Sequence, residues 1–188
     1  MALKAKRPQR PRRSTKQKVW DYMRRNRNFR AGDIMMILDL NSDFLLPIFR
    51  ALELAGYLEL ESGSQTFKDR HYKLIKNTGI LSPFILKKPC DIVRDENTGD
   101  EFILDGSHPI QVEDKIKLLR AMRKQEITRE TIANNAGMNP YSAKVFRYIE
   151  EFTEAGIMEK SGRIKSSRSF SINLEKRAEM LEVLGGVA

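Results

Sequence analysis

Apolar residues in the first 80 positions recur at helical spacing in three segments and then alternate in two short ones. The first segment opens with Ser14 and Gln17 in the form of a capping box. The third is followed by Gly56, at the position that commonly ends a helix. Residues 14–79 are therefore expected to form three helices and a two-stranded hairpin. The predicted helices cover 14–25, a stretch from about 31, and a stretch from 41–43 to 55, and the predicted strands cover 57–60 and 71–75.

The same pattern recurs in residues 113–174. Helices are expected over 114–124, over 128–135 and from Asn139-Pro140 to Ala155, because asparagine caps a helix and proline suits its first turn. Residues 157–160 and 167–173 predict a second hairpin. Positions with the same role lie 100 residues apart, as in the pairs Leu45/Val145, Phe49/Ile149, Leu52/Phe152, Ala55/Ala155 and Gly56/Gly156. This regularity indicates a tandem repeat.

The remaining segments differ in composition from the two units. Residues 1–13 combine prolines with basic residues, which predicts a flexible arm. Residues 80–112 contain a turn signal at 97–100 between apolar pairs, which predicts a small acidic β-hairpin linking the units. Residues 175–188 are expected to be a C-terminal tail. The predicted fold class is α+β, mostly helical.

Charge is unevenly distributed along the chain, whose net charge is +9. Residues 1–30 hold twelve Lys and Arg against a single acid, whereas residues 91–114 hold eight acids against Arg94. The basic excess favours a polyanionic partner, either nucleic acid or an anionic lipid surface. Cys90 is the only cysteine, no apolar run is long enough to span a membrane, and no secretory signal begins the chain. We therefore expect a cytoplasmic protein without a membrane partner, nucleoid-associated if bacterial.

A resemblance to a known family rests on the segment from Asn139 to Ile149, with the downstream residues Phe152, Ala155, Gly156 and Ile157. A helix, a short helix, a turn, a capped helix and a hairpin in this order resemble the winged helix-turn-helix domain of DNA-binding proteins. The resemblance covers about residues 14–76 and 113–174. A second, fainter similarity links Tyr72–Gly79, followed by Pro83, to early-region proteins of Mu-like phages. The first resemblance implies that the protein binds double-stranded DNA.

The predicted DNA-reading surface belongs to the second unit. If Val145, Ile149 and Phe152 face the core, helical spacing turns another set of side chains outward. Lysine and arginine suit phosphate and guanine, and recognition helices read bases with their first turns. The candidate base-reading residues of this helix are Asn139, Tyr141, Ser142, Lys144, Arg147 and Tyr148.

Two further basic segments are candidate DNA contacts. The turn of the second hairpin is free of acids and is expected to contact the backbone or the minor groove through Arg163, Lys165 and Arg168. The arm is similar to minor-groove arms, and its candidate contacts are Arg7, Arg10, Arg12 and Arg13. A solvated tail that gives only nonspecific affinity is the alternative for the arm.

The first unit departs from this chemistry. Aligned on the glycines, it has Phe44, Leu46, Pro47 and Ile48 where the second unit has its polar face. Such a face cannot read base edges, and we expect it to be buried against the other unit, the acidic hairpin or a second subunit. A homodimer through this face is therefore predicted. The pair Met35-Met36 is expected in the core.

No enzyme site is indicated by the sequence. The histidines His71 and His108 and the single Cys90 lack metal-ligand spacing, and no glycine-rich phosphate loop is present. We therefore expect no catalysis, no metal and no cofactor. Three functions remain: a sequence-specific transcription regulator or replication initiator, a winged-helix module that binds proteins, and an architectural protein that coats DNA with little sequence preference.

Overall fold

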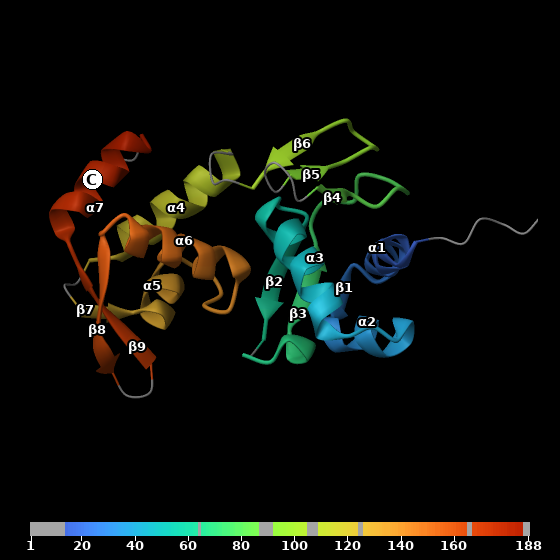
Figure 1. Cartoon of the computed structure of the whole chain (residues 1–188), viewed down its shortest axis with the longest axis horizontal. Coiled ribbons are helices and arrows are strands. Elements are labelled where there is room, and N and C mark those ends of the chain that lie inside the picture. Colours follow the sequence, from blue (N-terminus) through green and yellow to red (C-terminus); the bar gives the residue numbers. More distant parts are fainter. Residues whose placement is uncertain are drawn as a thin grey trace, which may run out of the picture.

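The computed structural model describes residues 14–63, 65–86, 92–104, 109–123, 126–164 and 167–185. Within these ranges the chain forms seven α-helices and three small antiparallel sheets, so it is an α+β protein as expected. The two units lie side by side, with the third sheet above the first unit (Figure 1). The longest described helices have 13 residues, and none of the described helices has the length and apolar character needed to cross a membrane.

The first unit begins with the predicted capped helix. The backbone N–H of Gln17 donates to the Ser14 hydroxyl at 3.2 Å, whereas the Gln17 side chain donates to Asp21 and to the carbonyl of Ile80. Its elements are α1 (Thr15–Asn26), β1 (Asn28–Arg30), α2 (Ala31–Leu38), α3 (Ser42–Leu54), β2 (Leu58–Ser62), a 3-10 turn (Phe67–Asp69) and β3 (His71–Leu74). Its strands pair in the order β1-β3-β2.

The second unit repeats this order of elements. Its elements are α4 (Pro109–Ala121), β7 (Glu126–Thr128), α5 (Arg129–Asn135), α6 (Ala143–Glu154), β8 (Met158–Ile164) and β9 (Ser167–Ile172). Its strands pair as β7-β9-β8, which is the arrangement of the first sheet. Each hairpin also has an irregularity at the same place, between Leu60 and Ser62 in one unit and between Lys160 and Gly162 in the other.

The third helix of each unit ends in the same way. Gly56 and Gly156 adopt φ values of 75° and 69°, which favour glycine because a Cβ atom is strained there. Tyr57 N–H then donates to Leu52 at 2.8 Å, and Ile157 N–H donates to Phe152 at 2.9 Å. The predicted helix ends at Ala55-Gly56 and Ala155-Gly156 are thus confirmed.

The predicted start of α6 at Asn139-Pro140 is wrong. The helix begins at Ala143, and the Ser142 hydroxyl accepts from the backbone N–H of Lys144 at 3.2 Å. Asn139 closes a local turn instead, since its side-chain oxygen accepts from Tyr141 N–H at 3.0 Å. Serine competes with asparagine as a cap, and here the later residue prevails.

The predicted acidic hairpin is part of a three-stranded sheet formed by β4 (Phe84–Leu86), β5 (Ile92–Arg94) and β6 (Glu101–Ile103). Val93 and Phe102 belong to the core of the first unit, and the Tyr57 hydroxyl donates to the buried Asp95 carboxylate at 2.8 Å. The linker sheet is therefore packed onto the first unit.

Part of the expected C-terminal tail is a helix, α7 (Leu174–Val183). Asn173 caps it by accepting from Lys176 N–H at 3.1 Å, and Leu181 is fully buried in the second core. The Arg177 side chain donates to the carbonyl of Leu119 on α4 at 2.7 Å. These contacts attach α7 to the second unit.

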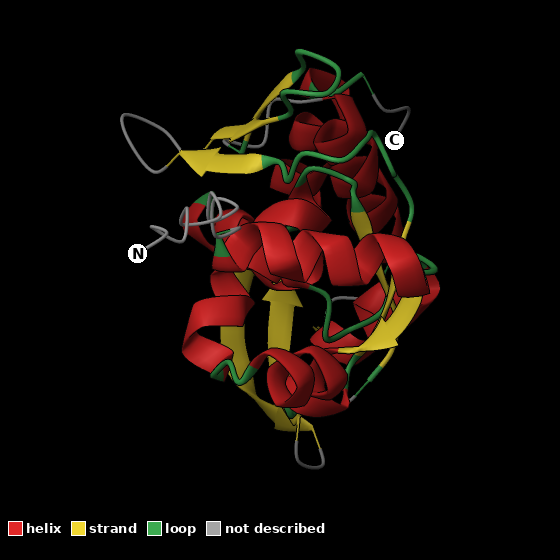
Figure 2. Cartoon of the chain, turned by 90° about the vertical axis from the view of Figure 1, so that its right-hand side faces the viewer, coloured by secondary structure: helices red, strands yellow, loops and turns green. Residues whose placement is uncertain are grey.

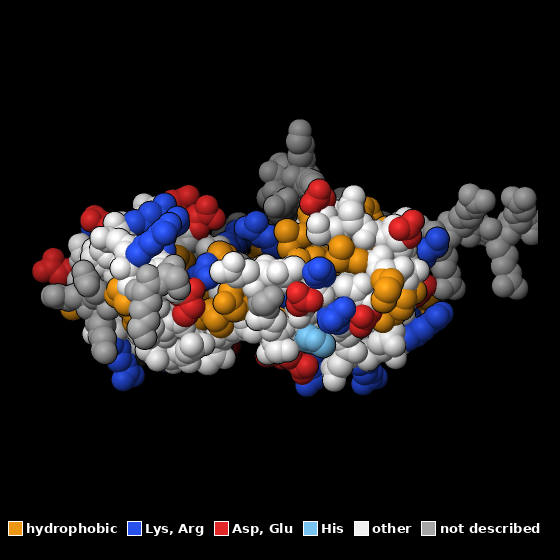
Figure 3. All heavy atoms as spheres, turned by 90° about the horizontal axis from the view of Figure 1, so that it is seen from below, with side chains coloured by type: hydrophobic (Ala, Val, Ile, Leu, Met, Phe, Trp, Pro, Cys, Tyr) orange, Lys and Arg blue, Asp and Glu red, His pale blue; other side chains and the backbone are white. Residues whose placement is uncertain are grey.

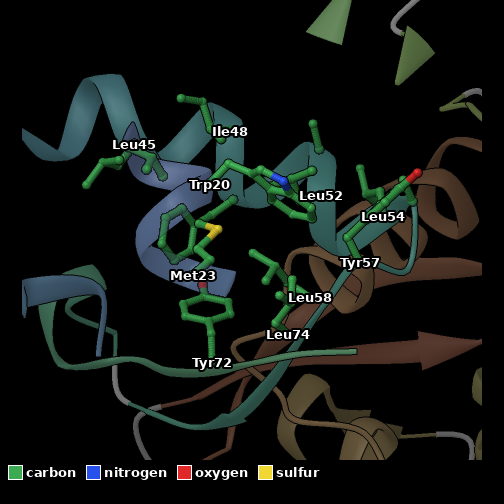
Figure 4. Packing of buried hydrophobic residues seen from close by; sticks show 14 of the residues in the cluster. Trp20, Met23, Leu45, Ile48, Leu52, Leu54, Tyr57, Leu58, Tyr72 and Leu74 are labelled. Atoms are coloured by element: carbon green, nitrogen blue, oxygen red, sulfur yellow. The ribbon is translucent and has the colours of Figure 1, made fainter. Parts of the chain in front are cut away.

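Each unit has a core of its own. Trp20, Tyr57 and Tyr72 are fully buried in the first, where α1, α3 and the strands meet (Figure 4). In the view from the end of the first unit, helices lie across the strands of its sheet (Figure 2). Met36, expected in the core, is 75% exposed, whereas Met35 packs against the core. Adjacent helix positions face different sides, so the core can accept only one of the two.

Candidate nucleic-acid interface

The hairpin β8–β9 carries exposed basic side chains away from the second core. Arg163 on β8 lies directly opposite Arg168 on β9, and Lys160 precedes Arg163 on β8. All three are exposed, and within the described residues none forms an ion pair. Lys165 lies outside the described residues. The hairpin therefore presents at least three cationic groups that are free to meet an anion.

A groove of about 860 Å³ separates this hairpin from α6. Phe146 from α6 is 43% exposed, and the guanidinium of Arg129 stacks on its ring at 4.1 Å. The same guanidinium lies 5.9 Å from the ring of Tyr141. Gln65 from the first hairpin also lines the groove, so both units contribute to it. An aromatic ring and arginines side by side can hold a sugar or base next to phosphates.

Acidic side chains limit where an anion can lie in this groove. Glu130, Glu150 and Glu154 line it together with the basic residues, and Glu130 pairs with Arg129 at 2.9 Å. Viewed from the end that carries the hairpin tips, Lys and Arg side chains are interleaved with Asp and Glu (Figure 3). A phosphate is therefore held best beside Lys160, Arg163 and Arg168 and is repelled by the acidic side chains that line the same groove.

The expected outward face of α6 is largely buried. Ser142 is 5% exposed and its hydroxyl donates to the Glu53 carboxylate of α3, while Tyr148 is fully buried. The prediction that these two residues point to solvent is wrong. Tyr148 lies three residues after Val145 and four before Phe152, so it shares the spacing of the core stripe, and this signal could have identified it.

The other predicted residues of this helix region are also engaged with protein. The Lys144 ammonium forms an ion pair with Asp114 of α4 at 2.8 Å, and both side chains are less than one fifth exposed. Tyr141 packs against the core of the first unit, and Arg147 is half-buried. With Asn139 in its local turn, the first turns of α6 form a junction between the units.

The junction is centred on Glu53, which is only 2% exposed. Its carboxylate accepts from the Ser142 hydroxyl and from the backbone N–H of Ala143, at the N-terminus of α6. Burial raises the pKa of Glu53 above its ordinary value, against the opposing effect of these hydrogen bonds and of the Lys144 charge. The role of Glu53 was not predicted, because an acidic residue in the apolar half of a helix does not indicate which distant residues it will contact.

The first unit offers both basic and apolar surface. Arg25 and Arg27 are exposed at the end of α1, and Arg24 donates to Asn77 at 2.8 Å. The arm residues Arg7, Arg10, Arg12 and Arg13 lie outside the described residues, as do Cys90 and His108. On the apolar face, Phe44 and Leu46 are 37% and 43% exposed and Pro47 is exposed, but Ile48 is buried in the core. Phe44, Leu46 and Pro47 are therefore not buried against the other unit or the acidic hairpin, and the homodimer through this face stays a prediction. Ile48 is buried because its helical position coincides with the core stripe.

Comparison with protein-family models and with curated proteins gave no match for this chain. Among the described residues, no group of three or more His, Cys, Asp or Glu side chains is placed to hold a metal ion. Arg129 and Phe146 are among the groove residues that the sequence did not indicate. Phe146 differs from the predicted set because it faces the hairpin, whereas Ser142 and Tyr148 face protein.

Proposed function

We propose that the protein consists of tandem winged-helix units and binds double-stranded DNA through the hairpin β8–β9 of its second unit. The repeated order of helix, strand, helix, helix and two strands supports the fold assignment, since a hairpin that follows the third helix has the position of a wing. The identical placement of the hairpin irregularity in both units supports it as well.

The observation that carries the DNA proposal is the pair Arg163 and Arg168. They face each other across two strands of a hairpin that projects from the core, so their side chains share a short length of surface. Guanidinium groups bind phosphate oxygens in a bidentate manner, and phosphate neutralisation releases counterions from DNA. Lys160 extends this cationic edge along β8.

The proposed contact is to the DNA backbone, with little sequence preference. Ser142 and Tyr148 are buried and Lys144 is paired with Asp114, so the first turns of α6 are not available to base edges. Phosphate contacts position a protein on DNA but carry no sequence information directly. The geometry thus favours an architectural role over the base-reading regulator or replication initiator expected from the sequence.

The test compares two double charge reversals that alter the net charge equally. Arg163→Glu with Arg168→Glu changes the hairpin. Arg120→Glu with Lys176→Glu changes exposed residues of α4 and α7, and no residue of these helices lines the groove. Affinity for a short duplex of mixed sequence is measured by fluorescence anisotropy at several salt concentrations. The hairpin variant should bind at least about tenfold more weakly at low salt and show a salt slope lower by roughly 2, as expected for two lost phosphate contacts.

The control variant should bind nearly as the wild type does. Equal weakening of both variants would mean that only net charge matters, and absence of binding by the wild type at low salt would refute the proposal. A second duplex of different sequence tests the expected lack of base discrimination. An affinity difference of more than about a hundredfold between sequences would contradict contact through the backbone alone.

A further inference from the structure

The outer face of α3 carries a stripe of four exposed residues, Asp43, Leu46, Pro47 and Arg50. Their spacing of three, one and three residues places them on one side of the helix. Leu46 is 43% exposed, while the following turns of α3 are covered, since Ala51 and Leu54 are buried and Glu53 contacts α6. The stripe is therefore the exposed part of this helix, and two apolar side chains lie at its centre.

The charges of the stripe are symmetric about its centre. Asp43 and Arg50 lie at its two ends, equally far along the chain from the pair Leu46-Pro47. Asp43 accepts a hydrogen bond from the hydroxyl of its neighbour Ser42, at 3.4 Å. Within the described residues, neither Asp43 nor Arg50 makes an ion pair. A helix with opposite charges at equal distances from an apolar centre is complementary to an antiparallel copy of itself.

Proline strengthens the acceptor at one end of the stripe. Pro47 lies inside α3 and has no backbone N–H, so the carbonyl of Asp43, four residues earlier, lacks its helical donor. Asp43 thus offers its backbone carbonyl as an acceptor in addition to its carboxylate. A guanidinium group, with five N–H donors in a planar fork, can bind the carboxylate.

We propose that a second copy of the chain docks on this stripe, with the two α3 helices antiparallel across a two-fold axis near Leu46 and Pro47. Each Asp43 then pairs with Arg50 of the other copy, and the apolar pairs meet at the axis. Phe44, 37% exposed at the margin of the stripe, adds apolar area. This inference goes beyond DNA binding and does not depend on it, because the hairpin β8–β9 contributes nothing to the stripe.

The expected association is weak. Two turns of one helix bury less than the roughly 800 Å² per partner of a standard stable interface, so the dissociation constant should lie in the range of about 1 to 100 µM. Sedimentation equilibrium over low to high micromolar concentrations should show a reversible monomer–dimer equilibrium for the wild type.

Charge exchange provides the decisive test. Asp43→Arg alone and Arg50→Asp alone place like charges opposite each other twice per dimer, and each should weaken association by at least about tenfold. The two changes together restore opposite charges and should recover much of the wild-type affinity. Glu179→Arg, on the exposed surface of α7, is a matched control and should leave association unchanged. Circular dichroism of every variant establishes that it is folded.

Cross-linking tests the same geometry without relying on charge. Leu46→Cys in a Cys90→Ser background places one thiol near the two-fold axis, and mild oxidation should give a disulfide-linked dimer. A cysteine at Glu179 in the same background should give none. A wild-type monomer at several hundred micromolar would overturn the proposal, as would single and double charge variants that associate equally. Stable capture of a different protein by the stripe, with no self-association, would overturn it in favour of another partner.

Discussion

At the residue scale, the buried carboxyl group of Glu53 links the two units by accepting hydrogen bonds from Ser142 and Ala143. Because the folded-state pKa of Glu53 is raised, its protonation favours the folded protein. This stabilisation is fully present below the ordinary carboxyl pKa of about 4.3 and is lost as the pH rises through the raised value. Glu53→Gln keeps an acceptor for Ser142 and Ala143 without the charge. Its free energy of unfolding at neutral pH should equal or exceed that of the wild type, and the pH dependence above about 4.3 should become flatter.

Urea unfolding at a series of pH values measures this effect, with Glu53→Ala as the comparison. Alanine leaves the buried Ser142 hydroxyl and the Ala143 N–H without their acceptor, which should lower the free energy of unfolding by about 1 to 3 kcal/mol. A glutamine variant less stable than the wild type at neutral pH would show that the charge itself, at the N-terminus of α6 and near Lys144, stabilises the junction.

At the scale of elements, the two units form the same turn after their second helix with different residues. Asp39 after α2 and Gly137 after α5 both have positive φ, at 51° and 71°. The next residue closes each turn equivalently, since Leu40 N–H donates to Met35 at 2.9 Å and Met138 N–H donates to Ala133 at 2.8 Å. The first unit thus places a non-glycine residue in a conformation that the second unit assigns to glycine.

Substitutions at Gly137 and Asp39 should change the free energy of unfolding in opposite directions. A Cβ atom at Gly137 would meet nothing within 4 Å, so Gly137→Ala introduces only backbone strain and should lower the free energy of unfolding by about 1 kcal/mol. Asp39→Gly relieves the same kind of strain in the first unit and should raise the free energy of unfolding by about 0.5 kcal/mol. This gain is smaller than the strain energy that is relieved, because glycine also increases the entropy of the unfolded chain. Urea unfolding of the two variants decides, and a neutral Gly137→Ala would contradict the reasoning.

Local signals explain which elements could be predicted from the sequence. Ser14 as a cap, Gly56 and Gly156 as helix ends, and alternation in the hairpins each act over a few residues, and the structure contains all of them. Strands β1, β4 and β7 and helix α7 were not predicted, because they are held by pairing or packing with other elements. The largest error concerns Ser142 and Tyr148. An amphipathic pattern identifies one buried stripe, but α6 contacts both its own core and the first unit, which widens its buried arc.

At the scale of the whole molecule, the two units have the same topology but expose different parts of their third helices. The third helix of the second unit is turned inward, against α3 and α4, whereas the first half of α3 remains outside with its charged and apolar stripe. We therefore propose DNA contact at the hairpin of one unit and self-association at the third helix of the other. Since the two surfaces lie on different units, a variant of one should leave the other function intact.

The net charge of the whole chain leads to the last prediction. Six of the nine net positive charges come from Lys and Arg within residues 1–13, a segment free of acids. The core residues that the structure describes begin at Val19, so we expect deletion of residues 2–13 to leave the unfolding transition unchanged. If the arm contacts phosphates, the deletion should lower the salt slope of DNA affinity by up to about 5, in addition to the loss caused by Arg163→Glu with Arg168→Glu. Anisotropy titrations between about 50 and 200 mM salt measure both slopes. The salt slope reflects every phosphate that the protein neutralises, because each one releases counterions. An unchanged slope after the deletion would therefore mean that the arm neutralises no phosphate and that only the hairpin contact remains.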